Sequence, residues 1–360
     1  MHLFFNKIQP IPALIVKRIG CLMTKAFNSL SEFRSIVEQF PTADDKAYHL
    51  ARERNAQLTK PAGSLGRLED IAVWYASWRG RARPTVNNPQ VVIFAGNHGV
   101  TSQGVSVFPT EVTAQMVINF EAGGAAINQL TDCFGASLDV HALQLELPTL
   151  DFTKGAAMSE ADCVSALYSG WSSVDEKTDL LVAGEMGIGN TTSAAAVALA
   201  LFGGSGTDWA GKGTGLDVEG VALKARIVEA GLAANPSAEG NGLKALMCLG
   251  GRELAAMAGA IARARSLRIP VILDGFICCA AAACLHATSE AALDHCVAGH
   301  QSAERAHQKL LKNINKDPLL SLGLRLGEGS GAALAISVVK AAVACHSFMA
   351  TFADAGVSQG

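Results

Sequence analysis

Charged and aromatic residues are scarce in this 360-residue chain, and their scarcity narrows the class of protein. Charged side chains make up 17% of the sequence, the formal net charge is −3, and lysine and arginine are scattered along it. This argues against a nucleic-acid-binding surface as the main function. Only 6% of the residues are aromatic, whereas 49% are hydrophobic and glycine is abundant. That composition suits a compact α/β enzyme, and the length allows either one large domain with a smaller companion or two domains.

No C-x-x-C pair occurs, and the cysteines have no regular spacing, which indicates buried thiols in a reducing compartment rather than disulfides. We therefore expect a cytoplasmic protein. No H-E-x-x-H pattern is present either, so we expect no metal site at the histidines and the cysteine of residues 295–307. The nine cysteines are Cys21, Cys133, Cys163, Cys248, Cys278, Cys279, Cys284, Cys296 and Cys345.

Long hydrophobic runs are also missing, and even the apolar stretch after Gly331 carries Lys340. We therefore expect no membrane span. Residues 1–22 are apolar but lack a basic start and a small-residue cleavage site, so a secretory signal is not expected. Our preferred interpretation is an upstream start codon, with Met23 as the functional beginning. A disordered or docking extension is the alternative.

Residues 179–200, DLLVAGEMGIGNTTSAAAVALA, are the stretch around which the chain is organised. A short apolar run predicts a buried parallel strand, a Gly-rich polar turn follows, and a helix is expected from Ser193. Such a turn presents backbone N–H groups at the positive end of a helix dipole, which suits a phosphate. A Walker A pattern is absent, so an ordinary Gly-rich connection remains the alternative. Glu185 is unexpected there, because a carboxylate beside an anion site repels the ligand. It would need a separate role, such as binding a hydroxyl or polarising a reacting group.

Two further predicted strands end in polar residues. Residues 90–96 lead to Asn97 and His98, and residues 269–275 contain Asp274. If the sheet is parallel, these residues and Glu185 converge at its carboxyl edge, the usual crevice for ligands. His98 is either a ligand or acid/base, or a structural histidine.

Other segments have both structural and functional interpretations. We expect helices within residues 29–40, 44–58, 66–80, 218–230, 241–249 and 252–266, and a strand at 137–145. Thr110 and Thr113 are candidate helix caps, and the glycine-dense loop 203–215 is long enough to be functional. Side chains within 106–116 suit a flat heteroaromatic ligand or core packing equally. Glu328 precedes a helix, where dipole complementarity explains it, but the glycines at 327, 329 and 331 suggest a ligand against the backbone.

Eight blocks in order make the chain resemble the nicotinate-nucleotide:5,6-dimethylbenzimidazole phosphoribosyltransferase family of cobalamin nucleotide-loop assembly. They are KPAGSLGRLE (60–69), FAGNHGV (94–100), GVSVFPTEVTAQM (104–116), GEMGIGNTT (184–192), GGRELAAMAG (250–259), VILDGF (271–276), AGHQSAE (298–304) and RLGEGSGAALA (325–335). They cover the chain from residue 60 almost to its C-terminus, and eight in sequence are highly specific.

The resemblance implies transfer of the phosphoribosyl group of nicotinate mononucleotide to 5,6-dimethylbenzimidazole, with no cofactor and no metal. It implies an α/β fold, a three-layer Rossmann-like parallel sheet with a small helical domain formed from N- and C-terminal segments, in a homodimer. Residues 1–22 would be an extension, 23–85 with about 335–360 the small domain, and 86–334 the large catalytic domain.

The resemblance also implies site residues. Glu328 would be the general base that removes the benzimidazole N–H proton, and Glu185 a second active-site carboxylate. The phosphate and ribose would be bound by Gly187, Gly189, Asn190, Thr191, Thr192, Gly213, Thr214, Gly215 and Lys224. The benzimidazole pocket would be lined by Ser106, Phe108, Gln115, Met116, Ser302, Leu324 and Leu326. The position that many members fill with Asp is Asn97 here, so we assign it no charge-dependent role.

Two other functions are compatible with the same residues. A nucleotide hydrolase could use Glu185 and Glu328 on water, and it would release nicotinate without an acceptor base. A nucleotide sensor or carrier would bind the nucleotide without turnover. The expected partners are the two substrates and a second copy of the chain, and neither nucleic acid nor a membrane is expected.

Overall fold

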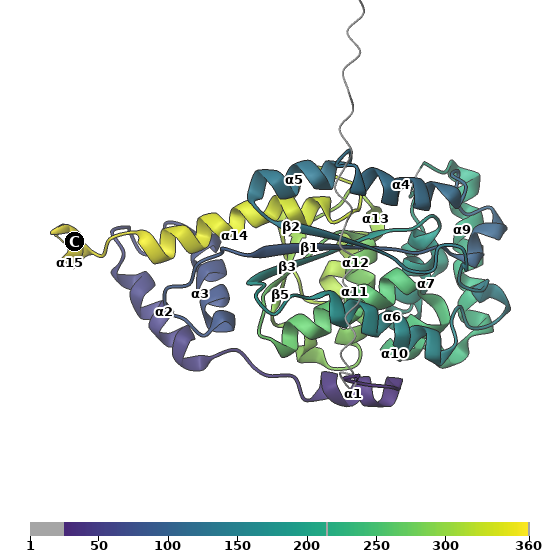
Figure 1. The fold of residues 1–360 in the computed structure, drawn as a ribbon, viewed down its shortest axis with the longest axis horizontal. Coiled ribbons are helices and arrows are strands. Elements are labelled where there is room, and N and C mark those ends of the chain that lie inside the picture. Colours follow the sequence, from purple (N-terminus) through teal and green to yellow (C-terminus); the bar gives the residue numbers. More distant parts are fainter. Residues whose placement is uncertain (1–24, 214, 359–360) are drawn as a thin grey trace, which may run out of the picture.

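The computed structural model describes residues 25–213 and 215–358, which are arranged around a six-stranded sheet (Figure 1). The strands are β1 (Pro89–Ala95), β2 (Ser137–Ala142), β3 (Leu180–Met186), β4 (Val271–Leu273), β5 (Cys296–His300) and β6 (Pro318–Leu320). Their order is β2-β1-β3-β4-β5-β6, and every neighbouring pair is parallel. The strand order reverses between β1 and β3, and open α/β sheets bind ligands at such a switch point, beyond the carboxyl ends of the strands.

Helices flank both faces of this sheet. In chain order they are α1 (Leu30–Glu38), α2 (Asp45–Gln57), α3 (Arg67–Arg79), α4 (Glu111–Glu121), α5 (Ala126–Phe134), α6 (Glu160–Ser173), α7 (Asn190–Phe202), α8 (Gly206–Trp209), α9 (Val218–Ala234), α10 (Gly242–Leu249), α11 (Arg252–Ser266), α12 (Phe276–His286), α13 (Arg305–Asn313), α14 (Ser330–Phe348) and α15 (Phe352–Ala355). Short 3₁₀ turns lie at Gly99–Gln103, Phe152–Lys154, Pro236–Ala238 and Glu290–Leu293. The predicted α/β class with a three-layer parallel sheet is confirmed.

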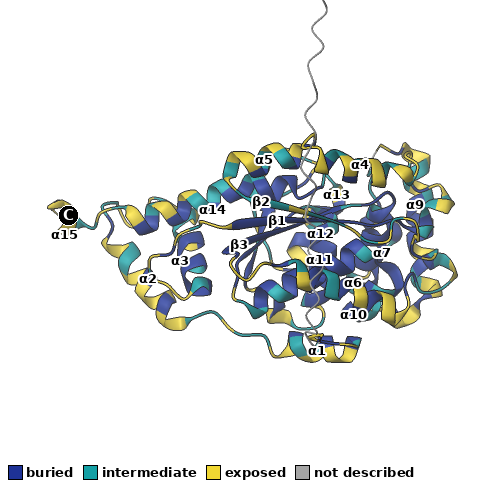
Figure 2. Ribbon diagram, viewed as in Figure 1, coloured by how far each residue is buried: buried dark blue, intermediate teal, exposed yellow. Residues whose placement is uncertain are grey.

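Alternating side chains of the central strands build two cores, one on each face of the sheet. In β1, Val92 and Phe94 join the core with α6, α7, α10, α11 and α12, whereas Val91 and Ile93 join the core with α3, α4, α5 and α14. This follows from the pleat, which points successive side chains to opposite faces. Because both faces are covered, β1 is buried along its whole length (Figure 2).

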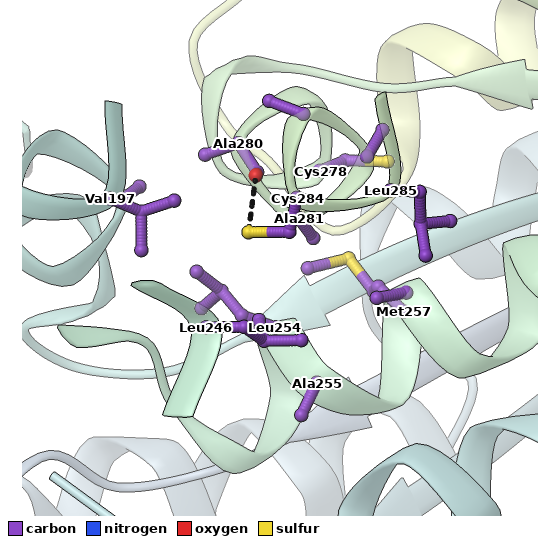
Figure 3. Close-up of a cluster of buried hydrophobic side chains, with 14 of the residues drawn as sticks. Val197, Leu246, Leu254, Ala255, Met257, Cys278, Ala280, Ala281, Cys284 and Leu285 are labelled. Carbon is purple, nitrogen blue, oxygen red and sulfur yellow. Dashed lines mark hydrogen bonds between the residues drawn. The ribbon is translucent and has the colours of Figure 1, made fainter. Parts of the chain in front are cut away.

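Small side chains fill the first of these cores. Figure 3 shows Val197, Leu246, Leu254 and Met257 packed around alanines and cysteines of α12. The Cys284 thiol lies 3.5 Å from the Ala280 carbonyl one turn earlier, and burial raises its pKa. Such thiols are inert packing groups, and the alanine-rich sequence of α12 lets neighbouring helices approach closely.

α2 and the C-terminal segment of the chain are in contact at one end of the molecule. Leu58 forms an isolated bridge with Thr351, and Arg54 donates hydrogen bonds to the carbonyls of His346, Ser347 and Met349. α1 packs elsewhere, because Phe27 just before it lies edge-on to Tyr168 of α6. We therefore propose that the small helical unit consists of α2, α3 and the end of α14. The predicted extension, residues 1–22, lies outside the described residues.

Arg54→Ala is expected to destabilise the fold by about 1–3 kcal/mol, because three carbonyls at the end of α14 lose a charged donor. Urea unfolding of both variants measures the loss. Arg52→Ala is the matched control on the same helix, since Arg52 is exposed and its guanidinium lies 3.4 Å from the Tyr48 hydroxyl of the same helix. Equal urea midpoints for the two variants would contradict the role of Arg54.

The expectation that hydrophobic segments are too short to span a membrane is wrong for one helix. Among the described residues, α14 is long and apolar enough to do so by length and composition, with a mean hydropathy of 1.5 over an 18-residue window. The reason for its composition is visible in the fold, because 56% of that window is buried and Ile336, Val339 and Val343 belong to the core on its face of the sheet. A helix at the centre of a core passes the same test.

Candidate active site

A cavity of about 710 Å³ opens at the carboxyl edge of the sheet. It lies beyond the ends of β3, β4 and β5, where the crevice of a parallel sheet is expected. Its walls come from the start of α4, the turn between β3 and α7, the start of α12 and the segment before α14. The residues around it include Phe108, Met116, Glu185, Gly187, Asn190, Thr191, Gly213, Phe276, His300, Ser302, Glu304, Leu324, Arg325, Leu326, Gly327 and Glu328.

The turn between β3 and α7 has the geometry of an anion site. β3 continues to Met186, so Glu185 lies at its end, and α7 begins at Asn190 rather than at Ser193. Gly189, at a φ of 92°, is the residue before the helix and has no side chain to cap it. Gly187, Ile188, Asn190 and Thr191 line the cavity, so the start of α7, with the positive end of the helix dipole, lies at its edge. Thr113 was a candidate helix cap in the sequence, but it has a different role. Its hydroxyl accepts a hydrogen bond from the Ile188 amide and so holds this turn.

Lys224 supports the turn from behind. Its ammonium group donates to the Thr191 hydroxyl at 3.0 Å and to the Gly211 carbonyl at 3.3 Å, and its side chain is 1% exposed. Burial lowers the pKa of Lys224 to about 8, against the opposing influence of Glu304. Lys224 is therefore a buried cation beneath the start of α7.

His98 is a structural residue of the same region. Its ring is fully buried, with Nε2 2.5 Å from Glu253 and Nδ1 2.9 Å from the Ser193 hydroxyl. Since both ring nitrogens bond to buried protein groups, the structural interpretation of His98 holds. Asn97, at the end of β1, is likewise buried and donates to the Leu145 carbonyl.

The Glu185 carboxyl group is buried among other acids. Burial raises its pKa well above the usual value, and the charges of Asp274, Glu253 and Glu328 raise it further against a hydrogen bond from Asn190. The raised pKa favours the neutral carboxyl group, which repels a nearby phosphate less than a carboxylate does.

Glu328 also lines the cavity and is 6% exposed. Burial raises its pKa to about 7, and the charge of Asp274 adds to the effect. Its backbone has a φ of 59° between Gly327 and Gly329, which are also left-handed. A carboxylate with a pKa near neutrality in a cavity is suited to accept a proton.

Close packing against protein groups accounts for the glycines around Glu328, and Gly327 also lines the cavity. A Cβ on Gly331 would overlap the His300 ring, one on Gly327 would overlap the Glu185 carboxyl, and Gly329 packs against β3. The close approach of Gly327 to Glu185 brings the turn after β3 and the segment before α14 to the same cavity. The turn that follows Glu185 and the segment that carries Glu328 are therefore neighbours.

The structure separates the predicted site residues into two groups. Around the cavity lie Glu328, Glu185, Gly187, Asn190, Thr191, Gly213, Phe108, Met116, Ser302, Leu324 and Leu326. The other predicted residues do not line it: Gly189, Thr192, Gly215, Lys224, Ser106 and Gln115. Among these, Thr192 is fully buried in α7, Gln115 and Gly215 are exposed, and the Ser106 hydroxyl accepts from the Phe108 amide. Thr214 lies outside the described residues.

Four polar or aromatic residues at the cavity were not predicted as site residues: Phe276, His300, Glu304 and Arg325. Each lies inside one of the eight sequence blocks that carry the family resemblance, and that position could have identified it as a candidate site residue. Glu253, which pairs with His98 from α11, also lies in such a block.

The fold and the cavity together define an α/β enzyme in which the start of a helix and two buried carboxyl groups meet at the edge of a parallel sheet. A family model described as phosphoribosyltransferase matches residues 40–357. A relative from Ruegeria sp. (strain TM1040), named nicotinate-nucleotide–dimethylbenzimidazole phosphoribosyltransferase, is 64% identical over 338 residues, 94% of this chain and 100% of the relative. A relative of the same name from Novosphingobium aromaticivorans is 56% identical over 334 residues, 93% of this chain and 99% of the relative.

The chain therefore belongs to this phosphoribosyltransferase family, as the sequence blocks predicted. A crystal structure of an enzyme with that name from Thermus thermophilus superposes with a TM-score of 0.81 at 38% identity. The superposition covers 88% of this chain and 100% of the crystallised one.

Proposed function

We propose that this chain transfers the phosphoribosyl group of nicotinate mononucleotide to 5,6-dimethylbenzimidazole in cobalamin nucleotide-loop assembly. The products are α-ribazole 5′-phosphate and nicotinate. The relatives' shared name over 94% of the chain supports the substrates. The observation that carries the mechanism is that one cavity joins the start of α7, where a phosphate fits, to the carboxyl groups of Glu185 and Glu328.

The reaction is a displacement at C1 of the ribose. A bond forms from a benzimidazole nitrogen to C1, and the bond from C1 to the pyridinium nitrogen breaks, so nicotinate leaves with that electron pair. The N–H proton of the attacking ring passes to Glu328. The positive charge on the pyridinium nitrogen is neutralised as it leaves, which supplies the electrostatic drive without a metal ion.

Different walls of the cavity bind different parts of the two substrates. The amides at the start of α7, with Lys224 beneath them, hold the 5′-phosphate. Phe108, Met116 and Leu326 supply apolar surface for the flat ring opposite. Glu185, whose pKa is raised by burial, offers a hydrogen-bonding group to the sugar.

The reaction is tested by incubating the purified protein with both substrates in EDTA. We expect α-ribazole 5′-phosphate and nicotinate in equal amounts, detected by chromatography and mass spectrometry. Absence of the product would defeat the assignment. Release of nicotinate without an acceptor would instead indicate a hydrolase, and tight nucleotide binding with no turnover for any azole would indicate a sensor or carrier.

The pH dependence follows from the raised pKa of Glu328. A general base works in its deprotonated form, so kcat/KM should rise with pH up to about 7 and level off above it. The limb is measured at subsaturating benzimidazole with saturating nucleotide, so it reports the enzyme–nucleotide complex that the benzimidazole attacks. It should be missing in Glu328→Gln, and a wild-type profile that falls as pH rises through 7 would contradict the role.

We also propose that the protein works in the cytoplasm as a homodimer, as the family resemblance implies. Exposed apolar side chains beside the cavity, among them Val107, Leu322 and Leu326, suit a contact with a second copy. Light scattering after gel filtration would show twice the chain mass. A monomer at micromolar concentration would contradict the dimer.

A further inference from the structure

Asp274 binds the start of α14 from across the sheet edge. It lies after β4, is 1% exposed, and its two oxygens accept from the Gly329 amide at 3.1 Å and the Ala332 amide at 2.9 Å. Gly329 is the residue before the helix and Ala332 the third residue in it. A helix normally satisfies these two amides with its own polar side chains at the same positions. Glycine and alanine cannot do so, and Asp274 does it from another strand.

These two hydrogen bonds hold the backbone conformation of the turn that carries Glu328. The φ angles of Gly327, Glu328 and Gly329 are 83°, 59° and 72°, three left-handed residues in succession. A non-glycine residue in this region costs about 1–3 kcal/mol and persists only where neighbouring contacts hold it. Those contacts are the two hydrogen bonds from backbone amides to Asp274 and the hydrogen bonds from the Ser330 amide and hydroxyl to the Gly327 carbonyl.

Several charged or titratable groups face Glu328 and Asp274. Glu185 comes from β3, His300 from β5 with its Nε2 atom 3.4 Å from Asp274, and Cys278 from α12. Glu304 and Arg325 lie on the cavity wall. Asp274 is the group whose charge raises the pKa of Glu328 beyond the effect of burial. Its position and its charge therefore act on the same side chain.

We propose that Asp274 is the positioning residue of the general base. By capping α14 from the segment after β4, it fixes the left-handed turn that points the Glu328 carboxylate into the cavity. The inference rests on the proposed function, because it concerns the base of that reaction. Asp274 itself does not need to touch either substrate.

The test compares Asp274→Asn with Asp179→Asn. Asp179 is also buried and accepts from two backbone amides, those of Asn87 and Asn88, but it lies at the amino end of β3. Both variants should lose a similar amount of thermal stability. Asp274→Asn should lower kcat by about 10- to 100-fold, because the base is misplaced, while KM for the nucleotide changes by less than about threefold. Its ascending kcat/KM limb should also move to lower pH, because a negative charge beside Glu328 is gone. The limb of Asp179→Asn should stay in place.

Asp274→Glu separates charge from position. It keeps the negative charge but displaces it by one methylene, so the pH limb should remain near that of the wild type while kcat stays at least about tenfold lower. This variant also decides the question if Asp274→Asn does not fold, because wild-type kcat in Asp274→Glu would overturn the inference. So would an Asp274→Asn enzyme with the kcat and pH limb of Asp179→Asn. A wild-type protein that forms no product would overturn the proposed function itself, and the inference with it.

Discussion

Replacing Glu328 by glutamine is expected to lower kcat/KM by about 10³-fold, a loss of about 4 kcal/mol of transition-state stabilisation. The amide has the size of the carboxyl group, so the left-handed turn and the cavity wall should persist. It cannot accept the benzimidazole proton at neutral pH, and that is the function lost. Steady-state kinetics with both substrates measures the loss, and calorimetry should show that nicotinate mononucleotide binds as in the wild type.

The choice of acceptor makes this prediction specific to a base. An azole with a more acidic N–H is partly anionic before it binds and needs less help from Glu328. The ratio of wild-type to Glu328→Gln activity should therefore fall as the acceptor becomes more acidic. A constant ratio would mean that Glu328 contributes through structure, and near-normal turnover would remove its role as base while leaving the reaction class standing.

Replacing Lys224 by methionine is expected to raise KM for nicotinate mononucleotide by about 10- to 100-fold, with a smaller change in kcat. The buried ammonium supports Thr191 and the anion site, and a hydrogen bond from a charged group contributes about 1.5–3 kcal/mol. Methionine fills similar space without the charge, so the fold should survive. Lys212→Met is the matched control, because Lys212 is an exposed lysine next to the same loop.

The pH dependence of nucleotide binding provides an independent check on Lys224. The ammonium is charged below its pKa of about 8, so affinity should weaken as pH rises through 8. Isothermal titration calorimetry between pH 6.5 and about 9 should show this in wild type and Lys212→Met but not in Lys224→Met. Equal KM values for the two variants would contradict a role of Lys224 in binding.

The centre of the fold could be predicted because its strands are buried on both faces. β1 and β3 read as continuous apolar runs, which identified them and, with the polar residues after them, the carboxyl edge of the sheet. β5 and β6 were not predicted. β5 contains Gly299 and ends in a histidine, and β6 has only three residues beginning with proline, so neither has the local pattern of a strand. Their neighbours in the sheet, far apart in sequence, stabilise them.

The site was predictable where one segment carries it and unpredictable where it depends on contacts between segments. The turn after Glu185 and the acid among glycines before α14 are local patterns. The link from Asp274 to Gly329 joins residues 55 positions apart, and the pair of His98 and Glu253 joins residues 155 apart. Lys224 was placed near the nucleotide only through the family resemblance, and it lies beneath the loop rather than in the cavity wall.

The most direct test of the account is a crystal structure of the protein with nicotinate mononucleotide and a benzimidazole, collected with Glu328→Gln so that turnover is slow. We predict the phosphate at the start of α7, beside residues 187–191, and a ring nitrogen within hydrogen-bond distance, about 2.6–3.2 Å, of the residue 328 side chain. C1 of the ribose should lie between that ring and the nicotinate. A phosphate bound away from the start of α7, or a benzimidazole out of reach of residue 328, would contradict the central claim.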